Sequence, residues 1–310
     1  MSNIRPLPEA LQKIACEELN EVPERIDQDL RDFRQWIERQ RHLKARTDDQ
    51  FLISFLRGCK YSLEKAKNKL DKYYTLKSKY PEFYTIQNID DPRVIELYKM
   101  GIGLHLPTPL NENGPRIQYF RPGNYPTDKY TFTDVMAIAN SFQELNMRFD
   151  DYCVVNGYIQ ILDMSSYTAS HILQLTPNIV RKIFIFAEDA LHLRQRAIHI
   201  INTSPTVDRL LNMIKSLMPV KQQQRLFIHG SNLESLYEHI PLKYLPRDLG
   251  GENSSFDEIN KLQWEVFQEN REYFIENKKY GVDESLRESK STDYTQLFGI
   301  EGSFRKLMVD

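Results

Sequence analysis

Five basic residues in the second half of the chain have side chains that could bind an anionic group. They are Arg194, Arg196, Lys215, Lys221 and Arg225. Arg194 and Arg196 enter an apolar run two positions apart, and residues two apart on a strand point to one face, so we expect their side chains to converge. Guanidinium groups bind phosphate oxygens through paired hydrogen bonds. The alternative interpretation is a set of solvated surface charges that bind no ligand.

Residues that could carry out catalysis form no recognisable set. The chain lacks the Gly-x-Ser-x-Gly of a nucleophile elbow, the His-Glu-x-x-His of zinc peptidases, the P-loop and the complete Gly-x-Gly-x-x-Gly fingerprint. Asp163 is the best candidate acid because it ends an apolar run, but no base or nucleophile matches it by spacing. His199 and His229 lie in or beside apolar runs, and we interpret them as structural. We therefore expect neither catalytic residues nor a metal site.

Three short apolar runs rich in isoleucine, at 158–162, 197–201 and 226–228, are predicted to be strands. They alternate with helical segments of more than a dozen residues, and this order requires crossover connections and a parallel sheet. A parallel sheet is covered on both faces, so its strands can be almost entirely apolar. A further strand is predicted at 116–120. It follows a glycine- and proline-rich segment, 101–114, that we expect to be a loop.

The remaining elements are predicted to be helices. The segments 24–42, 50–57 and 64–79 show helical periodicity, so the first quarter of the chain is expected to be all-helical. Later helices are expected from Thr133 to Met147, from Pro177 to Ala190, over 205–218 and over 256–273. A charged tail follows the last helix, and we expect it to be loosely packed.

The composition is that of an ordinary globular protein. Of the 310 residues, 41% are hydrophobic and 27% are charged, and the formal net charge of −2 argues against a globally basic nucleic-acid-binding protein. No apolar run approaches the roughly 18–20 residues that span a bilayer, and the N-terminus lacks an apolar signal core. Cys16, Cys59 and Cys153 are too far apart for a zinc site or a disulfide framework. We expect a cytosolic protein without a transmembrane segment.

Several motifs in a fixed order carry a resemblance to a known family. They are Ile161-Leu-Asp163, Ile198-His-Ile-Ile-Asn202, the segment from Lys221 to His229-Gly230, and Leu245-Pro-Arg-Asp-Leu-Gly-Gly251. Together they resemble the lipid-binding domain of the CRAL-TRIO (Sec14-like) family, and residues 47–66 are similar to the N-terminal helical module of that family. Within the family, the chain is most similar to the branch of α-tocopherol transfer protein, cellular retinaldehyde-binding protein and clavesin.

The resemblance implies an α/β fold in which a mostly parallel sheet, flanked by helices, encloses an apolar pocket beneath a helical lid. An all-helical N-terminal module at 1–89 would precede a lipid-binding domain at 90–275 and a tail at 276–310. The segment 205–218 is the expected lid, since its apolar residues recur at the spacing of one helical face. Without the resemblance, the same pattern would favour a permanently closed core helix.

The resemblance also implies which residues line the pocket. The matching positions are Met136, Ala139, Gln143, Tyr158, Leu162, Leu175, Ile183, Phe186, Ala187, Ile198, Val207, Leu210, Ile214 and Met218. Gln143 and Tyr158 have side chains that could hydrogen-bond a hydroxyl or carbonyl group of the ligand. Each could equally be an ordinary packing residue.

The five basic residues named above match positions that bind phosphoinositide headgroups in this branch of the family. The helical module of the family usually supplies a further basic residue where this chain has Cys59, and the neighbouring Lys60 is the candidate to replace it. The resemblance thus implies a cytoplasmic carrier, without a cofactor, for a tocopherol, retinoid or carotenoid-like molecule that it transfers during transient contact with phosphoinositide membranes. The alternatives are a phospholipid or phosphoinositide exchange protein and an interaction module with a vestigial pocket.

Overall fold

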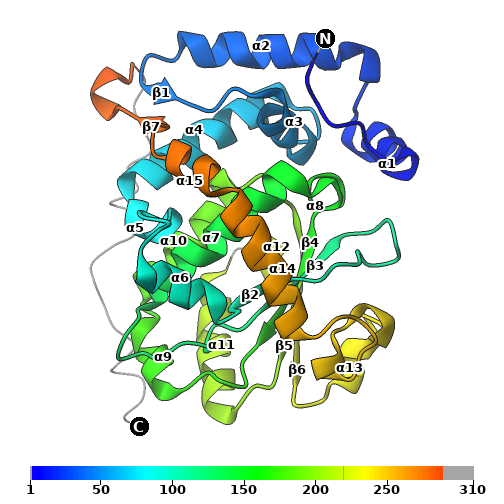
Figure 1. The fold of residues 1–310 in the computed structure, drawn as a ribbon, viewed down its shortest axis with the longest axis vertical. Coiled ribbons are helices and arrows are strands. Elements are labelled where there is room, and N and C mark those ends of the chain that lie inside the picture. The colour runs from blue at the N-terminus through cyan, green and yellow to red at the C-terminus, as the bar shows by residue number, and fades with distance from the viewer. Residues whose placement is uncertain (1, 219, 289–310) are drawn as a thin grey trace.

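A five-stranded sheet lies at the centre of the protein (Figure 1). The computed structural model describes residues 2–218 and 220–288. In spatial order, the strands are β2 (Gly103–His105), β3 (Arg116–Phe120), β4 (Tyr158–Asp163), β5 (Gln195–Ile201) and β6 (Leu226–Gly230). The pairs β3–β4, β4–β5 and β5–β6 are parallel, and β2 is antiparallel to β3. The mostly parallel sheet predicted from the apolar runs is therefore confirmed.

The expectation that 101–114 is entirely loop is wrong, because β2 lies inside it. Its glycine reflects close packing and not a turn: a Cβ atom on Gly103 would lie 2.8 Å from Cε2 of Phe142. A glycine within a strand often marks such an approach by a neighbouring group. Leu104 pairs with Tyr119 across the edge of the sheet, and both side chains are buried.

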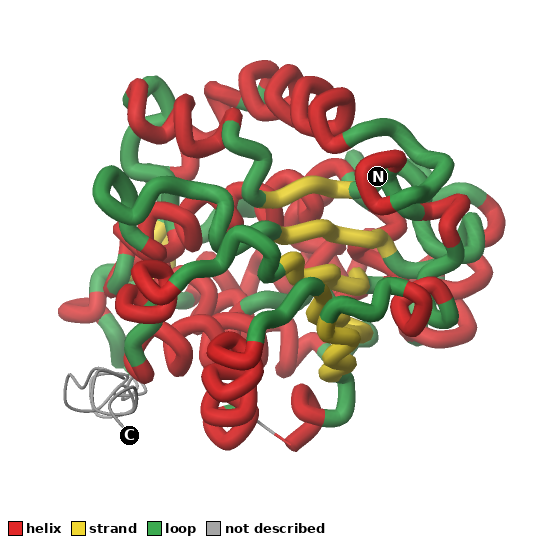
Figure 2. The backbone as a smooth tube through the Cα atoms, turned by 90° about the horizontal axis from the view of Figure 1, so that it is seen from below, coloured by secondary structure: helices red, strands yellow, loops and turns green. Residues whose placement is uncertain are grey.

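Helices lie on both sides of the sheet (Figure 2). From residue 92 onwards, the helices are α6 (Pro92–Lys99), α7 (Phe132–Phe149), α8 (Asp151–Asn156), α9 (Ala169–Gln174), α10 (Pro177–Ile185), α11 (Pro205–Leu217), α12 (Val220–Gln223), α13 (Glu234–Tyr237), α14 (Phe256–Glu269) and α15 (Arg271–Asn277). Short 3₁₀ turns occur at Pro23–Arg25, Leu242–Tyr244, Arg247–Leu249 and Glu284–Leu286. The α/β class predicted from the sequence is confirmed.

Several predicted helices differ in detail from the structure. The single helix expected over 256–273 is two helices, α14 and α15, with Asn270 between them. The helix expected from Thr133 begins earlier, because Thr131 caps α7 in a capping box with Asp134. The helix expected over 177–190 is α-helical only to Ile185 and continues as a π-helical turn, Phe186–Ala190. Such turns are often found at functional sites, and this one forms part of a cavity wall described below.

The N-terminal module contains α1 (Glu9–Leu19), α2 (Ile26–Arg39), α3 (Asp49–Gly58), α4 (Leu63–Lys79) and α5 (Pro81–Tyr84). It is helical apart from β1 (Leu43–Lys44), which pairs with β7 (Gly281–Val282) from the end of the described chain. Arg287 also binds this module, donating to Asp71 and Thr75. The prediction of a loosely packed tail is therefore wrong for residues 276–288, since these contacts anchor them. Residues 289–310 of the predicted tail lie outside the described residues.

A buried ion pair joins α3 to the segment that follows α1. Arg57 Nε donates to Glu21 Oε2 at 2.8 Å, and the side chains of Arg57 and Glu21 are 1% and 0% exposed. Gln12 and Tyr61 also donate to the Glu21 carboxylate. Burial alone would raise the pKa of Glu21, but the hydrogen bonds and the charge of Arg57 outweigh it and lower that pKa. The carboxylate is therefore held ionised inside the module.

Replacing Arg57 by methionine is expected to lower the free energy of unfolding by about 3–5 kcal/mol, because Glu21 would remain buried without its partner. Urea denaturation of the full chain measures this. Lys13→Met is the control, since Lys13 lies 3.9 Å from Glu17 with both side chains largely exposed, and its loss should cost less than about 1 kcal/mol. Equal effects of the two substitutions would contradict the assignment.

Candidate functional site: an apolar cavity beside a basic edge

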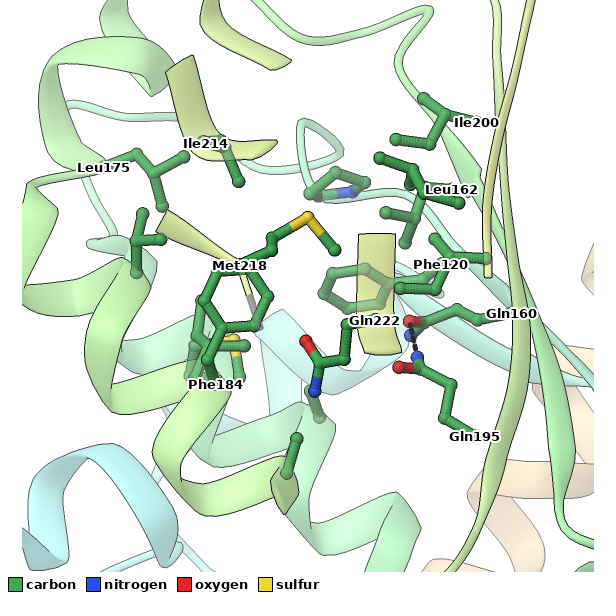
Figure 3. Close-up of a pocket in the computed structure, with 18 of the residues that line it drawn as sticks. Phe120, Gln160, Leu162, Leu175, Phe184, Gln195, Ile200, Ile214, Met218 and Gln222 are labelled. Atoms are coloured by element: carbon green, nitrogen blue, oxygen red, sulfur yellow. Dashed lines mark hydrogen bonds between the residues drawn. The ribbon is translucent and has the colours of Figure 1, made fainter. Parts of the chain in front are cut away.

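A cavity of about 240 Å³ lies between one face of the sheet and the helices α7, α10 and α11 (Figure 3). The equivalent volume for a single water molecule is about 10–15 Å³, so the space is large enough for an organic ligand. Most of the side chains around it are aliphatic or aromatic. Pockets for lipophilic molecules have this composition, with few polar groups.

The cavity exists because strand side chains alternate between the two faces of the sheet. On β4, Tyr158, Gln160 and Leu162 line the cavity, whereas Ile159 and Ile161 pack on the opposite face. That opposite face is filled by apolar side chains from α13, α14 and the segment between them. Only the face towards α10 and α11 leaves space for a ligand.

The structure brings together all the predicted pocket residues except one. Those that line the cavity are Met136, Ala139, Gln143, Tyr158, Leu162, Leu175, Ile183, Phe186, Ala187, Ile198, Leu210, Ile214 and Met218. Val207 does not line it, which corrects that prediction. Its side chain lies in the first turn of α11 and is buried within the apolar cluster that includes Ile200 and Leu211.

Further lining residues were missed by the sequence reasoning. They include Phe120, Gln160, Gln195, Ile200, Leu211, Gln222 and Leu226. Strand alternation could have identified Gln160 and Ile200, because each lies two positions from a predicted lining residue. No periodic signal pointed to Gln222, which lies on the four-residue helix α12.

Gln195 faces the cavity because of a β-bulge. Tyr158 pairs with Gln195 but Ile159 pairs with Ala197, so Arg196 is an extra residue in β5. In a regular strand Gln195 would share the face of Ala197, two positions away, which packs on the opposite side of the sheet. The bulge thus places one more amide in the cavity, where Gln195 Nε2 donates to Gln160 Oε1 at 2.9 Å.

Gln143 and Tyr158, the two predicted polar contacts, differ in their availability. Gln143 exchanges hydrogen bonds with Gln118 and also accepts one from Asn146. The Tyr158 hydroxyl has no hydrogen bond to a described residue, and burial raises the pKa of Tyr158. Gln143 is therefore already committed to protein partners, whereas Tyr158 keeps a free hydroxyl.

The helix α11 covers the cavity. Ser204 caps its first turn by accepting from the Val207 backbone N–H, and Leu210, Leu211 and Ile214 face the cavity. On the opposite face, Arg209, Asn212 and Lys215 are exposed. This arrangement agrees with the two faces read from the sequence. Whether the helix moves is not determined by its amphipathic pattern, so its role as a lid stays a prediction.

Arg194, Arg196 and Arg225 lie where β5 and β6 begin, but they are not equivalent. Arg194 donates to the backbone oxygens of Arg57 and Val155, and Arg196 Nε donates to that of Asn156 at 2.8 Å. The two guanidinium groups therefore both reach backbone carbonyls in the last turn of α8. The bulge at Arg196 interrupts the regular alternation from which this convergence was predicted. Burial, followed by the charge of Arg196, lowers the pKa of Arg194 to about 10. The Arg194 guanidinium group therefore uses much of its hydrogen-bonding capacity on protein backbone carbonyls.

The other basic residues have more freedom. The Arg196 side chain is 42% exposed. Arg225 donates to the Gln195 carbonyl at 2.6 Å. Lys215 and Lys221 are exposed, and their side chains have no polar partner among the described residues. We call Arg194, Arg196, Lys215, Lys221 and Arg225 the basic edge. That Lys215 and Lys221 act together with the three arginines stays a prediction.

Cys59 is buried near Arg194, and burial raises the pKa of its thiol. It therefore contributes no positive charge to the basic edge. Lys60 is exposed and adopts a left-handed backbone conformation with φ of 54°. Its side chain has no polar partner among the described residues, so its participation in the basic edge stays a prediction.

Asp163 and the two histidines have structural contacts. Asp163 accepts hydrogen bonds from Tyr119, Asn202 and the Ser165 backbone, and it faces away from the cavity. His199 and His229 hydrogen-bond to each other at 2.9 Å. Burial, with the nearby His229, lowers the pKa of His199 to about 4. These contacts agree with the structural interpretation made from the sequence.

Within residues 2–218 and 220–288, no helix combines the length and the apolar character needed to cross a membrane. The same residues contain no group of three or more His, Cys, Asp or Glu side chains arranged to hold a metal ion. The sheet, the cavity and the covering helix together define an α/β protein with an apolar binding cavity.

Comparison with known proteins identifies the family. A sequence model of the CRAL/TRIO domain matches residues 108–251, and one described as Pinta-like, UBA domain matches residues 22–94. Clavesin-2 of Mus musculus is 30% identical over 252 residues, which cover 81% of this chain and 76% of that protein. Clavesin-1 of Pongo abelii is 29% identical over 252 residues, covering 81% and 70%. The chain belongs to the CRAL-TRIO (Sec14-like) family of lipid-binding proteins.

Among solved structures, the crystal structure of Sfh5 covers 85% of this chain and 99% of its own, with 10% sequence identity and a TM-score of 0.42.

Replacing Ala139 by tryptophan is expected to reduce binding of the fluorescent probe cis-parinaric acid several-fold, because the indole would occupy the cavity that Ala139 lines. Fluorescence titration of the purified protein measures this. Ala10→Trp is the matched control, since Ala10 is exposed on α1. Undiminished binding by a folded Ala139→Trp protein would show that the probe binds elsewhere.

Proposed function

We propose that the protein is a cytoplasmic carrier that binds one hydrophobic small molecule, such as a tocopherol, a retinoid or a carotenoid-like molecule. The observation that carries this proposal is the buried apolar cavity beneath α11. A terpenoid-sized ligand that buries roughly 400–600 Å² of apolar surface would gain on the order of 10 kcal/mol before the costs of binding are subtracted. Such a gain supports useful affinity without a covalent bond.

Transfer is proposed to occur during transient contact with membranes that contain phosphoinositides. The basic edge supports this, because two of its exposed members lie near the C-terminal end of α11: Lys215 in its last turn and Lys221 on α12. Anionic headgroups would bind these basic residues. If the open state of the lid exposes more of the basic residues than the closed state, headgroup binding would shift the population towards the open state. In this mechanism α11 is the lid, and its opening exposes Leu210, Leu211 and Ile214.

An exchange protein for phospholipids or phosphoinositides is the alternative function. A specific contact favours it: Arg225 donates to the backbone of Gln195, whose side chain lines the cavity. We call the part of the cavity lined by Gln160, Gln195 and Gln222 its polar end. The contact with Arg225 places this end beside the basic edge. A headgroup placed there could contact both.

Native mass spectrometry of the purified protein, followed by organic extraction, tests the choice between these functions. One equivalent of a terpenoid, retinoid or sterol would support the carrier. A two-chain phospholipid would favour the exchange protein. An empty cavity that also refuses added lipids would contradict both and support an interaction module.

The double substitution Arg196→Glu with Lys221→Glu is expected to slow transfer to phosphoinositide vesicles roughly tenfold or more, because each reversed charge repels the anionic surface. Arg194 is avoided because its guanidinium holds two backbone carbonyls. Ligand capacity should remain unchanged, and high salt should reduce the difference.

The matched control for that experiment is Arg39→Glu with Lys261→Glu, which changes the net charge equally. Both residues are exposed, on α2 and α14. Transfer is measured by the loss of fluorescence energy transfer from labelled donor vesicles. If both double variants transferred ligand at the rate of the unmodified protein, the basic edge would have no role in membrane contact.

A further inference from the structure

Gln222 lines the cavity, and only one of its two side-chain polar atoms has a hydrogen-bond partner among the described residues. It lines the cavity from α12, and the residue is 4% exposed. Its Nε2 donates to Glu188 Oε1 at 2.8 Å, whereas its Oε1 is buried with no hydrogen-bond partner among the described residues. Figure 3 shows the Gln222 amide reaching into the space between Phe184 on one side and Gln195 on the other. A buried acceptor of this kind requires a donor.

Chemistry determines which way the Gln222 amide points. A carboxylate only accepts hydrogen bonds, so the amide must turn its NH₂ group towards Glu188 and its carbonyl towards the cavity. Reversing the amide would bring two acceptors together and lose a charge-assisted hydrogen bond. Gln222 therefore offers the cavity an acceptor and not a donor.

Glu188 is itself held in place by the N-terminal module. It lies in the π-helical turn, and Lys69 Nζ on α4 binds its backbone oxygen at 2.6 Å and that of Leu191 at 2.7 Å. Burial lowers the pKa of Lys69, although the nearby acidic residues oppose this change. Because the turn is fixed from outside the cavity, the orientation of Gln222 does not depend on the ligand.

The other amides that line the cavity near the sheet have protein partners. Gln195 donates to Gln160, and Gln143 exchanges hydrogen bonds with Gln118. The Gln222 carbonyl oxygen is a fully buried acceptor for which the described residues supply no donor. A hydroxyl group on the ligand would supply that donor, whereas an aldehyde, an ether or a hydrocarbon would not.

We infer that Gln222 binds the hydroxyl group of the cargo, so that the preferred ligand is a lipid alcohol or phenol. This inference rests on the carrier function proposed above and narrows its ligand class. The hydroxyl end would lie beside α12 and the glutamines, and the apolar body would extend towards Leu175 and Ile214, which Figure 3 places away from them. Glu188 acts as a positioning residue, because it orients Gln222 without lining the cavity.

The test compares geranylgeraniol with its methyl ether, two probes that differ in the hydroxyl proton and one methyl group. Each radiolabelled probe is presented in phosphatidylcholine vesicles, and the fraction bound to protein is measured after gel filtration. The unmodified protein should bind the alcohol roughly 5- to 100-fold more tightly than the ether, since the ether leaves the Gln222 carbonyl unsatisfied. Gln222→Met should reduce this preference to about threefold or less while leaving ether binding nearly unchanged.

Two further variants complete the experiment. Gln224→Met is the matched control, because Gln224 is exposed two positions away and does not line the cavity, and it should keep the preference for the alcohol. Glu188→Gln releases the Gln222 amide so that it can turn its NH₂ group inwards. It should therefore improve binding of geranylgeranial, the aldehyde, relative to the alcohol, and this readout remains if Gln222→Met fails to fold.

The outcomes separate this inference from the proposed function. Equal binding of alcohol and ether by the unmodified protein would overturn the role of Gln222 and leave the carrier function standing. A preference that persists in Gln222→Met would also overturn it. Binding of neither probe would count against the carrier function itself.

Discussion

The two faces of the central sheet are buried against different neighbours, and the rest of the structure depends on this difference. On one face, Ile159, Ile161 and Ala197 pack against side chains from α13, α14 and the segment between them. On the other, Leu162, Ile198 and Ile200 border a cavity. Apolar side chains that border a cavity make fewer dispersion contacts with other protein atoms than side chains in a packed core. A lipophilic ligand would make those contacts instead, and their dispersion energy would then contribute to the free energy of binding.

The cavity wall is supported by the N-terminal module and not only by the lipid-binding domain. Lys69 binds two backbone carbonyls at the π-helical turn, and the Phe186 ring stacks on Tyr84 with centroids 4.4 Å apart. Phe186 lines the cavity, and Glu188 in the same turn orients Gln222. The helical module therefore determines the shape and the polarity of a site to which its own helices contribute no lining residue.

The residues of the basic edge differ in burial, and burial determines whether their charged groups bind the protein or face the solvent. Arg194 and Arg196 both reach backbone carbonyls at the end of α8, where the helix dipole favours positive charge. Arg194 is enclosed there, whereas Arg196 keeps a partly exposed guanidinium. Lys221 remains exposed on α12, directly before Gln222 and four positions after the last residue of α11. A contact with an anionic surface would thus lie near both the covering helix and the polar end of the cavity.

The sequence by itself determined the fold class and just under half of the residues that line the cavity. Spacings of two residues in strands such as 158–162 and of three or four in α11 are local consequences of backbone geometry, so they could be read without a structure. Position-by-position resemblance then selected pocket residues such as Met136 and Met218, which the structure brings together.

Tertiary structure alone decided the features that depend on distant segments. The bulge at Arg196, which turns Gln195 into the cavity, arises from pairing with β4 and has no local signal. Residues 281–287 are held by β1 and α4, more than 200 positions earlier in the chain. The orientation of the Gln222 amide is set by Glu188, 34 positions away. Each of these depends on which groups meet in space, and sequence periodicity carries no information about such encounters.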